Sequence, residues 1–190
     1  MTELALSLFR INMTELKNIH RPLHIYVSGQ IYFITASTYN KLKILDDGRK
    51  RLIVRNNIIY SAIKWKIKVF AWVILSNHYH VLFQADKGED ISAFIRTVNS
   101  KSSIELNRLN QTPNRMNFYQ YWDRCVRDEK DFYIKFNYIH YNPVHHDYVK
   151  NPKDYLFSSY NEYVNQYGES WLYECLKANG LNEMRYLGRI

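Results

Sequence analysis

Two histidines separated by one residue are the first feature of the sequence that could do chemistry. His78 and His80 flank Tyr79 in the run SNHYHVLF, whose apolar residues predict a β-strand. Because side chains at positions i and i+2 of a strand point to the same face of a sheet, both imidazoles are expected to converge on one point. Two neutral imidazoles placed in this way can hold a divalent metal ion. The structural alternative is a pair of partly exposed strand histidines without a ligand.

A second group of polar side chains is predicted on a helix near residue 140. In FNYIHYNPVHH, Tyr138 and Asn142 are four residues apart and therefore share a helix face, where they present a phenol and an amide together. The alternative is a core tyrosine followed by a helix-capping asparagine. Tyr133 and Tyr141 are rival phenols. Tyr133 is turned well away from Tyr138, whereas Tyr141 lies on an adjacent face that the spacing alone does not separate from it.

The elements that must position these groups follow a recognisable order. Strands are expected where Ile, Val, Tyr, Phe and Thr dominate, and helices where apolar residues recur at three- and four-residue intervals. We predict strand 30–40, helix 48–64, strands 66–76 and 78–85, helix 91–109, strand 118–127 and helix 128–142, which Pro143 helps to end. This order predicts an α+β fold of the ferredoxin-like split β-α-β type, an antiparallel sheet with helices packed on it.

The predicted sheet and helices occupy the middle of the chain, so we divide the sequence into three parts. Residues 1–28 are expected to form an N-terminal arm, with helical spacing as far as a breaker at His20-Arg21-Pro22. Residues 29–143 are expected to form the domain that carries both groups of polar side chains, and residues 144–190 a C-terminal extension with short helices.

Composition favours a nucleic-acid partner. The formal net charge is +8, and aromatic residues make up 16% of the 190 residues, 17 of them Tyr, which suits the stacking of unpaired bases between basic side chains. A solvated helix face is the default reading of any single basic residue. The residues expected to contact a DNA backbone are Arg96, Lys101, Arg124, Arg127 and Lys135.

The cysteine count and the apolar runs exclude several classes of protein. Cys125 and Cys175 are the only cysteines, which excludes a disulfide framework or a four-cysteine zinc site and favours the cytoplasm. The apolar run at residues 1–9 is interrupted by Glu3, and nothing approaches 18 uninterrupted apolar residues. We therefore expect no signal peptide and no membrane span.

Taken together, AWVILSNHYHVLF and the later YIHYNPV resemble the HUH motif and the tyrosine helix of the IS200-like and REP-associated tyrosine transposases, the Y1 HUH endonucleases. The resemblance covers roughly residues 30–163 and includes YWDRCVRDEKDF and PKDYLFSSY. It implies a ferredoxin-like fold, a divalent metal bound by His78 and His80, and Tyr138 as the nucleophile. A further polar ligand often lies four residues after that tyrosine, a glutamine in the IS200 branch, and the residue here is the shorter Asn142.

The resemblance implies a single-stranded DNA transposase that cuts and rejoins DNA through a 5′-phosphotyrosine, with Mg²⁺ or Mn²⁺ as cofactor. Its expected partner is single-stranded or hairpin DNA, and monomer and homodimer both stay open. Three alternatives remain at this point. They are a domesticated hairpin-binding regulator without strand transfer, a non-catalytic nucleic-acid-binding module on the same fold, and a metal-dependent hydrolase in which Tyr138 is structural.

Overall fold

The computed structural model describes residues 26–178, so the helix predicted within residues 1–24 lies outside the described residues. One antiparallel sheet forms its centre, with the strand order β2-β3-β1-β4. The strands are β1 (Ile31–Thr38), β2 (Lys68–Ile74), β3 (His78–Gln84) and β4 (Phe118–Cys125). Because a helix connects β1 to β2 and another connects β3 to β4, neither pair is adjacent in the sheet. The structure thereby confirms the predicted α+β fold of the ferredoxin-like type.

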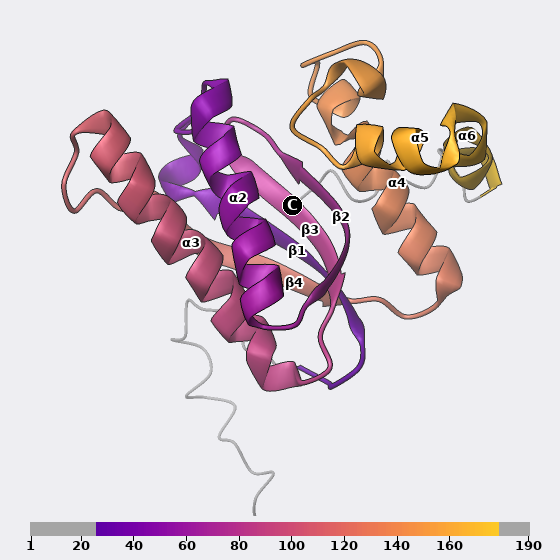
Figure 1. The fold of residues 1–190 in the computed structure, drawn as a ribbon, viewed down its shortest axis with the longest axis horizontal. Coiled ribbons are helices and arrows are strands. Elements are labelled where there is room, and N and C mark those ends of the chain that lie inside the picture. Colours follow the sequence, from indigo (N-terminus) through magenta and orange to yellow (C-terminus); the bar gives the residue numbers. More distant parts are fainter. Residues whose placement is uncertain (1–25, 179–190) are drawn as a thin grey trace, which may run out of the picture.

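Both connecting helices cover the same face of the sheet (Figure 1). They are α2 (Gly48–Lys64) and α3 (Gly88–Asn110). Helix α2 begins at Asp47, whose side chain accepts a hydrogen bond from the backbone N–H of Lys50. The alternating apolar residues of the strands pack against the apolar stripes of the two helices, as Tyr79 and Phe83 of β3 do with Phe94 of α3.

The opposite face of the sheet carries α4 (Glu129–His145), which packs on β2 and β3. Asp128 caps this helix by accepting a 2.7 Å hydrogen bond from the backbone N–H of Asp131. Its apolar residues Phe136 and Ile139 join Phe33 and Leu82 of the sheet in a second core. Figure 1 shows α4 grouped with the last helices, away from α2 and α3. The two faces therefore have separate cores, and the odd and even residues of β3 belong to different ones.

Helix α4 ends at His145 and not at residue 142, because Pro143 lies inside its last turn. Proline removes one backbone donor and disfavours a continued helix, which was the basis of the predicted end. Close to a C-terminus that single loss is tolerated, and the backbone N–H of His146 still donates to the carbonyl of Asn142 at 3.1 Å.

The segment after α4 packs on the outer edge of the sheet. It contains a 3₁₀ turn (Pro152–Asp154), α5 (Tyr160–Tyr167) and α6 (Glu169–Ala178). Ser158 forms a bridge with Val73 of β2, the Ser159 N–H donates to the Trp72 carbonyl, and the Tyr155 hydroxyl donates to the Ile74 carbonyl at 2.7 Å. These bonds cover the edge strand β2, which would otherwise be open to pairing. The division at residues 28 and 143 stays a prediction.

A membrane-crossing helix would need a long apolar run, and none of the helices within residues 26–178 has one.

Candidate active site

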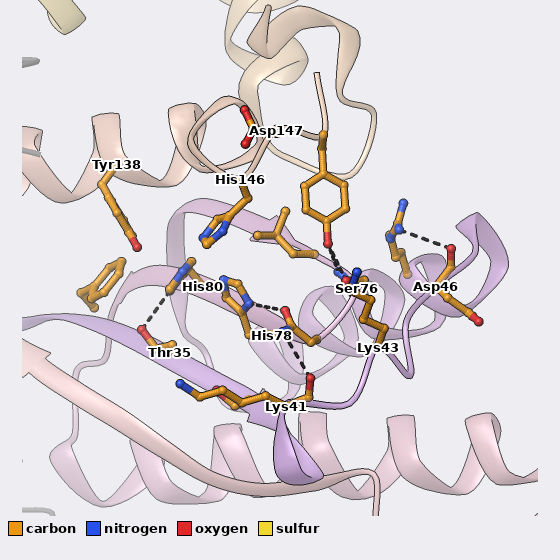
Figure 2. Close-up of a pocket in the computed structure, with 16 residues that line it drawn as sticks. Thr35, Lys41, Lys43, Asp46, Ser76, His78, His80, Tyr138, His146 and Asp147 are labelled. Carbon is orange, nitrogen blue, oxygen red and sulfur yellow. Dashed lines mark hydrogen bonds between the residues drawn. The ribbon is translucent and has the colours of Figure 1, made fainter. Parts of the chain in front are cut away.

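A cleft of about 680 Å³ opens between the ends of β1 and β3 and the C-terminal half of α4. Figure 2 shows its central side chains, with the two strand histidines side by side and the Tyr138 hydroxyl directed toward His80. The structure thus brings together three of the groups singled out in the sequence. The residues that line this central part include Phe33, Thr35, His78, His80, Tyr138 and His146.

The two histidines occupy one face of β3, and their ring centroids are 4.9 Å apart. Each Nδ1 atom has a hydrogen-bond partner. His78 Nδ1 donates to Asn77 Oδ1 at 2.8 Å, and His80 Nδ1 is bonded to Thr35 Oγ1 at 2.9 Å. When the Nδ1 atoms carry the protons, both Nε2 atoms keep a free lone pair, and the ring orientations are fixed. This is the tautomer that a metal ligand needs.

Burial favours the neutral form of both imidazoles. It lowers the pKa of His78 to about 4, with a further contribution from repulsion by His146, and it lowers the pKa of His80 well below the ordinary value. The lone pairs of the two rings are therefore not lost to protonation near neutral pH.

Asn142 completes the group from the side of α4. Its carboxamide is fully buried, and neither its oxygen nor its nitrogen makes a hydrogen bond of normal geometry within residues 26–178. The amide is nevertheless close enough to raise the pKa of His78 and to lower that of Tyr138. Buried polar atoms without partners are uncommon, because each costs about 1–3 kcal/mol.

The donor atoms around this point fit a divalent metal. His80 Nε2 and the Asn142 amide are buried and have no hydrogen-bond partner in the part of the chain that the structure describes. An imidazole nitrogen and an amide oxygen are both atoms that bind metals in proteins. Within the described residues no three His, Cys, Asp or Glu side chains form a metal-binding cluster. Two imidazoles, an amide oxygen and oxygens of substrate or solvent make the ligand set that this site offers.

Tyr138 is the phenol that faces this ligand set. Its ring lies 5.3 Å from that of His80 and 6.0 Å from that of Phe33, between centroids. Burial raises the pKa of Tyr138, while the Asn142 amide and the positive charge of Arg124 act in the opposite direction. These two neighbours would stabilise a phenolate on this side chain more than on a tyrosine that is merely buried.

The rival tyrosines point elsewhere. Tyr133 packs on Phe132 and Phe136 and lines a different surface hollow. Tyr141 belongs to the apolar core around α4. Of the three phenols, Tyr138 alone lines the cleft that contains the histidines.

The other histidines of this region divide into two kinds. His140 is fully buried on the far side of α4, where its Nε2 is bonded to Ser159 Oγ at 2.8 Å, so it fixes the C-terminal segment to the helix. His146 lines the cleft with its ring 5.3 Å from that of His78, and the exposed His145 lies 5.2 Å beyond it.

The basic residues predicted to contact DNA are scattered over the molecule. Arg96 and Lys101 lie on α3, on the opposite side of the sheet from the cleft, and Lys101 is placed over the Tyr60 ring at 4.5 Å. Arg124 is exposed on β4, and the register pairs it with Phe33, which faces the cleft.

Arg127 and Lys135 share one partner instead of facing the cleft. The Lys135 ammonium is buried against the Asp131 carboxylate, to which it is hydrogen bonded. Arg127 is exposed, and its Nε lies 3.5 Å from the second oxygen of the same carboxylate. Lys135 therefore has no accessible charge to offer to DNA.

Sequence reasoning missed the basic residues at the other end of the cleft. Lys41, Lys43 and Arg51 line it where β1 turns toward α2. Their signal was the cation-rich stretch KLKILDDGRKR, which lies far from both motifs in the sequence. Only the position of β1 next to β3 brings it to the histidines.

A sheet that presents two histidines to the tyrosine of a helix packed across it is the arrangement of the HUH tyrosine nucleases. The sequence model of the family described as "Transposase IS200 like" matches residues 26–127, which are 102 of the 190 residues. The chain belongs to this family of DNA-processing transposases. The matched part includes His78 and His80 and ends before α4, so it does not include Tyr138 or Asn142.

Relatives with known names agree with this family. A Haemophilus influenzae protein named as a REP-associated tyrosine transposase is 29% identical over 164 residues, which cover 77% of this chain and 89% of that protein. The REP-associated tyrosine transposase of Escherichia coli K12 is 26% identical over 140 residues, 73% of this chain and 81% of that protein. The solved structure of a REP-associated tyrosine transposase bound to a REP hairpin has the same fold, with a TM-score of 0.66, 23% identity and coverage of 77% and 86%.

Proposed function

We propose that this protein cuts and rejoins single-stranded DNA through a covalent 5′-phosphotyrosine on Tyr138, in the cleft that holds His78 and His80. The observation that carries the proposal is that the Tyr138 phenol and the unpartnered Nε2 of His80 face the same cleft. Membership of a transposase family supports the proposal, because transposases cut and join DNA strands.

The reaction needs a nucleophile, a way to balance charge and a leaving group. The Tyr138 oxygen attacks the phosphorus and forms a P–O bond, the bond from phosphorus to the 3′ oxygen breaks, and the phenol proton is lost as the 3′ oxygen gains one. An ordinary tyrosine is only about 0.1% phenolate near pH 7, so the attack needs stabilisation of negative charge. Attack by a 3′-OH on the phosphotyrosine reverses the step and joins strands without ATP.

His78, His80 and Asn142 are the residues that would hold a divalent cation, for which Mg²⁺ or Mn²⁺ fits the mixed nitrogen and oxygen donors. Bound there, the ion would polarise the scissile phosphate and offset the charge that develops on the leaving oxygen. The residues of the chain have the remaining tasks. Thr35 and Asn77 orient the two rings, and the packing of α4 on β2 and β3 holds Tyr138 over the site.

Single-stranded DNA next to a hairpin is the substrate that we propose. A relative with the same fold has been solved with a REP hairpin bound, and this chain has a net charge of +8 and a cleft with Lys41 and Lys43 at one end. Arg96, Lys101 and Arg127 stay predicted DNA contacts, and Lys135 is left out because its charge is paired with Asp131.

An adduct assay with two labels tests the chemistry. A hairpin oligonucleotide with single-stranded flanks is incubated with Mn²⁺ or Mg²⁺ and the wild-type protein, and the products are separated in SDS. A 5′-phosphotyrosine transfers the 3′-labelled fragment to the protein and releases the 5′-labelled fragment with a free 3′-OH. The Tyr138→Phe variant should lose the adduct, whereas Tyr133→Phe and Tyr141→Phe should keep it, because neither of these residues lines the cleft.

Each other outcome contradicts the proposal in a specific way. Metal-dependent cleavage without an adduct, retained by Tyr138→Phe, would mean that the site activates water as a hydrolase does. Tight hairpin binding with no cleavage under any metal would mean a regulatory binding protein. Loss of the adduct in Tyr141→Phe alone would assign the nucleophile to the other tyrosine.

A further inference from the structure

The helices of residues 26–178 cover the histidine-bearing face of the sheet unevenly. Helix α4 packs on β2 and β3, whereas the main helical segment within residues 26–178 that contacts β4 is the short 3₁₀ turn Tyr39–Lys41. No residue of β4 lines the cleft itself, but the β4 side chains on this face lie next to the cleft residues of β1. The identity of these β4 side chains determines which ligand this part of the sheet can bind.

The register of β4 with β1 determines which β4 side chains lie on the same face of the sheet as the cleft. Trp122 lies opposite Thr35, and Arg124 lies opposite Phe33, in the antiparallel pair of β1 and β4. Residues directly opposite each other in such a pair point to the same face. Since Thr35 and Phe33 line the cleft, the side chains of Trp122 and Arg124 lie on the same face of the sheet, beside the cleft. Thr35 is also the partner of His80, so a single strand, β1, lies between Trp122 and the proposed ligand.

Trp122 is exposed for a residue of its size. Its exposed fraction is 51%, whereas Tyr121, its neighbour toward the other face, packs against the core beneath α2 and α3. A large indole that projects from a sheet beside a cleft offers a flat apolar surface of the kind on which unpaired bases stack. Adjacent strands lie about 4.8 Å apart, so the indole and His80, two strands away, are separated by roughly 10 Å of sheet.

Positive charge surrounds this surface. Arg124 is exposed on the same face of β4, and its charge reaches far enough to act on the Tyr138 phenol. Lys41 also lines the cleft, and it belongs to the short 3₁₀ turn Tyr39–Lys41, which contacts β4 (Figure 2). A flat aromatic surface between guanidinium and ammonium groups is complementary to a nucleotide, which has a base to stack and a phosphate to neutralise.

We propose that Trp122 and Arg124 form a nucleotide platform, in which the base of an unpaired nucleotide beside the scissile phosphate stacks on Trp122 while Arg124 contacts a phosphate of that strand. The platform rests on the proposed function, because it gives the single strand a defined path into the site. It makes Trp122 a positioning residue, which touches the DNA and takes no part in the bond changes. Stacking on an indole is tolerant of sequence, so the platform orients the strand and does not select a base.

Equilibrium binding to a matched pair of oligonucleotides tests the platform without any cleavage. The probes are fluorescein-labelled dT20 and a chain of the same length whose nucleotides are abasic, which keeps the phosphates and removes the bases. Trp122→Ala should bind dT20 on the order of tenfold more weakly than the wild type, and Trp122→Phe should recover most of that loss. On the abasic chain the wild type and Trp122→Ala should bind alike, because there is no base to stack.

Two further variants separate stacking from charge and from general effects of losing a tryptophan. Trp171→Ala removes an indole that is 40% exposed on α6 and should leave both affinities unchanged. Arg124→Gln should weaken the binding of both probes and reduce the slope of log affinity against log salt concentration by about one. Thermal unfolding of Trp122→Ala should match that of the wild type, because the side chain is half exposed on an edge strand.

Equal losses on dT20 and the abasic chain, no loss on either, or failure of Trp122→Phe to recover binding would each overturn the platform. Because the readout is affinity, it does not depend on the phosphotyrosine chemistry. A protein that forms no adduct yet shows the base-dependent loss would retain the platform and lose the proposed function. If the wild type forms the Tyr138 adduct and Trp122→Ala binds dT20 as tightly as the wild type, the proposed function stands and the platform is overturned.

Discussion

Thr35 and His80 face each other across β1 and β3, and Thr35 Oγ1 lies 2.9 Å from His80 Nδ1. The bond is buried, and Nε2, the other ring nitrogen, has no hydrogen-bond partner among the described residues. A hydrogen bond of this kind fixes the tautomer and the rotation of a metal-binding imidazole, and its loss typically costs 10–100-fold in metal affinity. Thr35 is thus an indirect determinant of the proposed metal site.

Replacing Thr35 with Val should weaken Mn²⁺ binding by about 10–100-fold, because valine has a similar shape and no hydroxyl. Thr35→Ser keeps the hydroxyl and should retain most of the wild-type affinity for Mn²⁺. Isothermal titration of the DNA-free protein with Mn²⁺ measures both. Equal affinities for wild type and Thr35→Val would mean that the hydroxyl does not orient the ring.

Binding of a divalent metal should also raise the thermal stability of the protein. Within residues 26–178 the buried Nε2 of His80 and the Asn142 amide have no hydrogen-bond partner, so an ion that binds the folded state would satisfy them. At a free Mn²⁺ concentration of about 100 times Kd the gain would be about 2.7 kcal/mol. Calorimetry with increasing Mn²⁺ should show this rise for the wild type and for His145→Ala, an exposed control, and should show none for His80→Ala.

The features that were predictable from the sequence are those that depend on local spacing. The alternation of His78, Tyr79 and His80 placed the two rings on one face, and the four-residue spacing placed Tyr138 and Asn142 on one side of α4. The order of strands and helices was sufficient for the ferredoxin-like fold. In each case the chemistry follows from the period of a single element.

The features that were not predictable depend on which elements touch. Thr35 and Trp122 reach the site only through the register of β1 with β3 and β4, which contains a shift between Ala36 and Thr38 on the β4 side. Lys135 shows the converse. A solvated helix face was the default expectation for this lysine, yet a carboxylate one turn earlier and the packing of α4 make it part of a buried ion pair.

Removing the Lys135 charge should destabilise the fold and leave DNA affinity nearly unchanged. Lys135→Met keeps the length of the side chain and leaves the Asp131 carboxylate largely buried without its main partner, which typically costs about 3–5 kcal/mol. Arg127→Ala is the control. It removes an exposed member of the same cluster and should cost less than about 1 kcal/mol. Urea unfolding measures both, and a loss of DNA affinity in Lys135→Met without a loss of stability would contradict this assignment.

The same ion pair should make stability depend on acid pH through Asp131. Burial by itself would raise the pKa of this carboxyl, but the hydrogen bond from Lys135 and the bonds from Arg127 outweigh it and lower the pKa below its ordinary value near 3.8. In the interval between the two pKa values the unfolded chain binds more protons than the folded one. The contribution is therefore complete above about pH 4 and is lost as the pH falls through the lower, folded pKa. The difference in unfolding free energy between wild type and Asp131→Asn should be constant from about pH 5 to 7 and should shrink below about pH 4. A difference that stays constant down to pH 2 would show that the carboxylate charge contributes nothing to this pair.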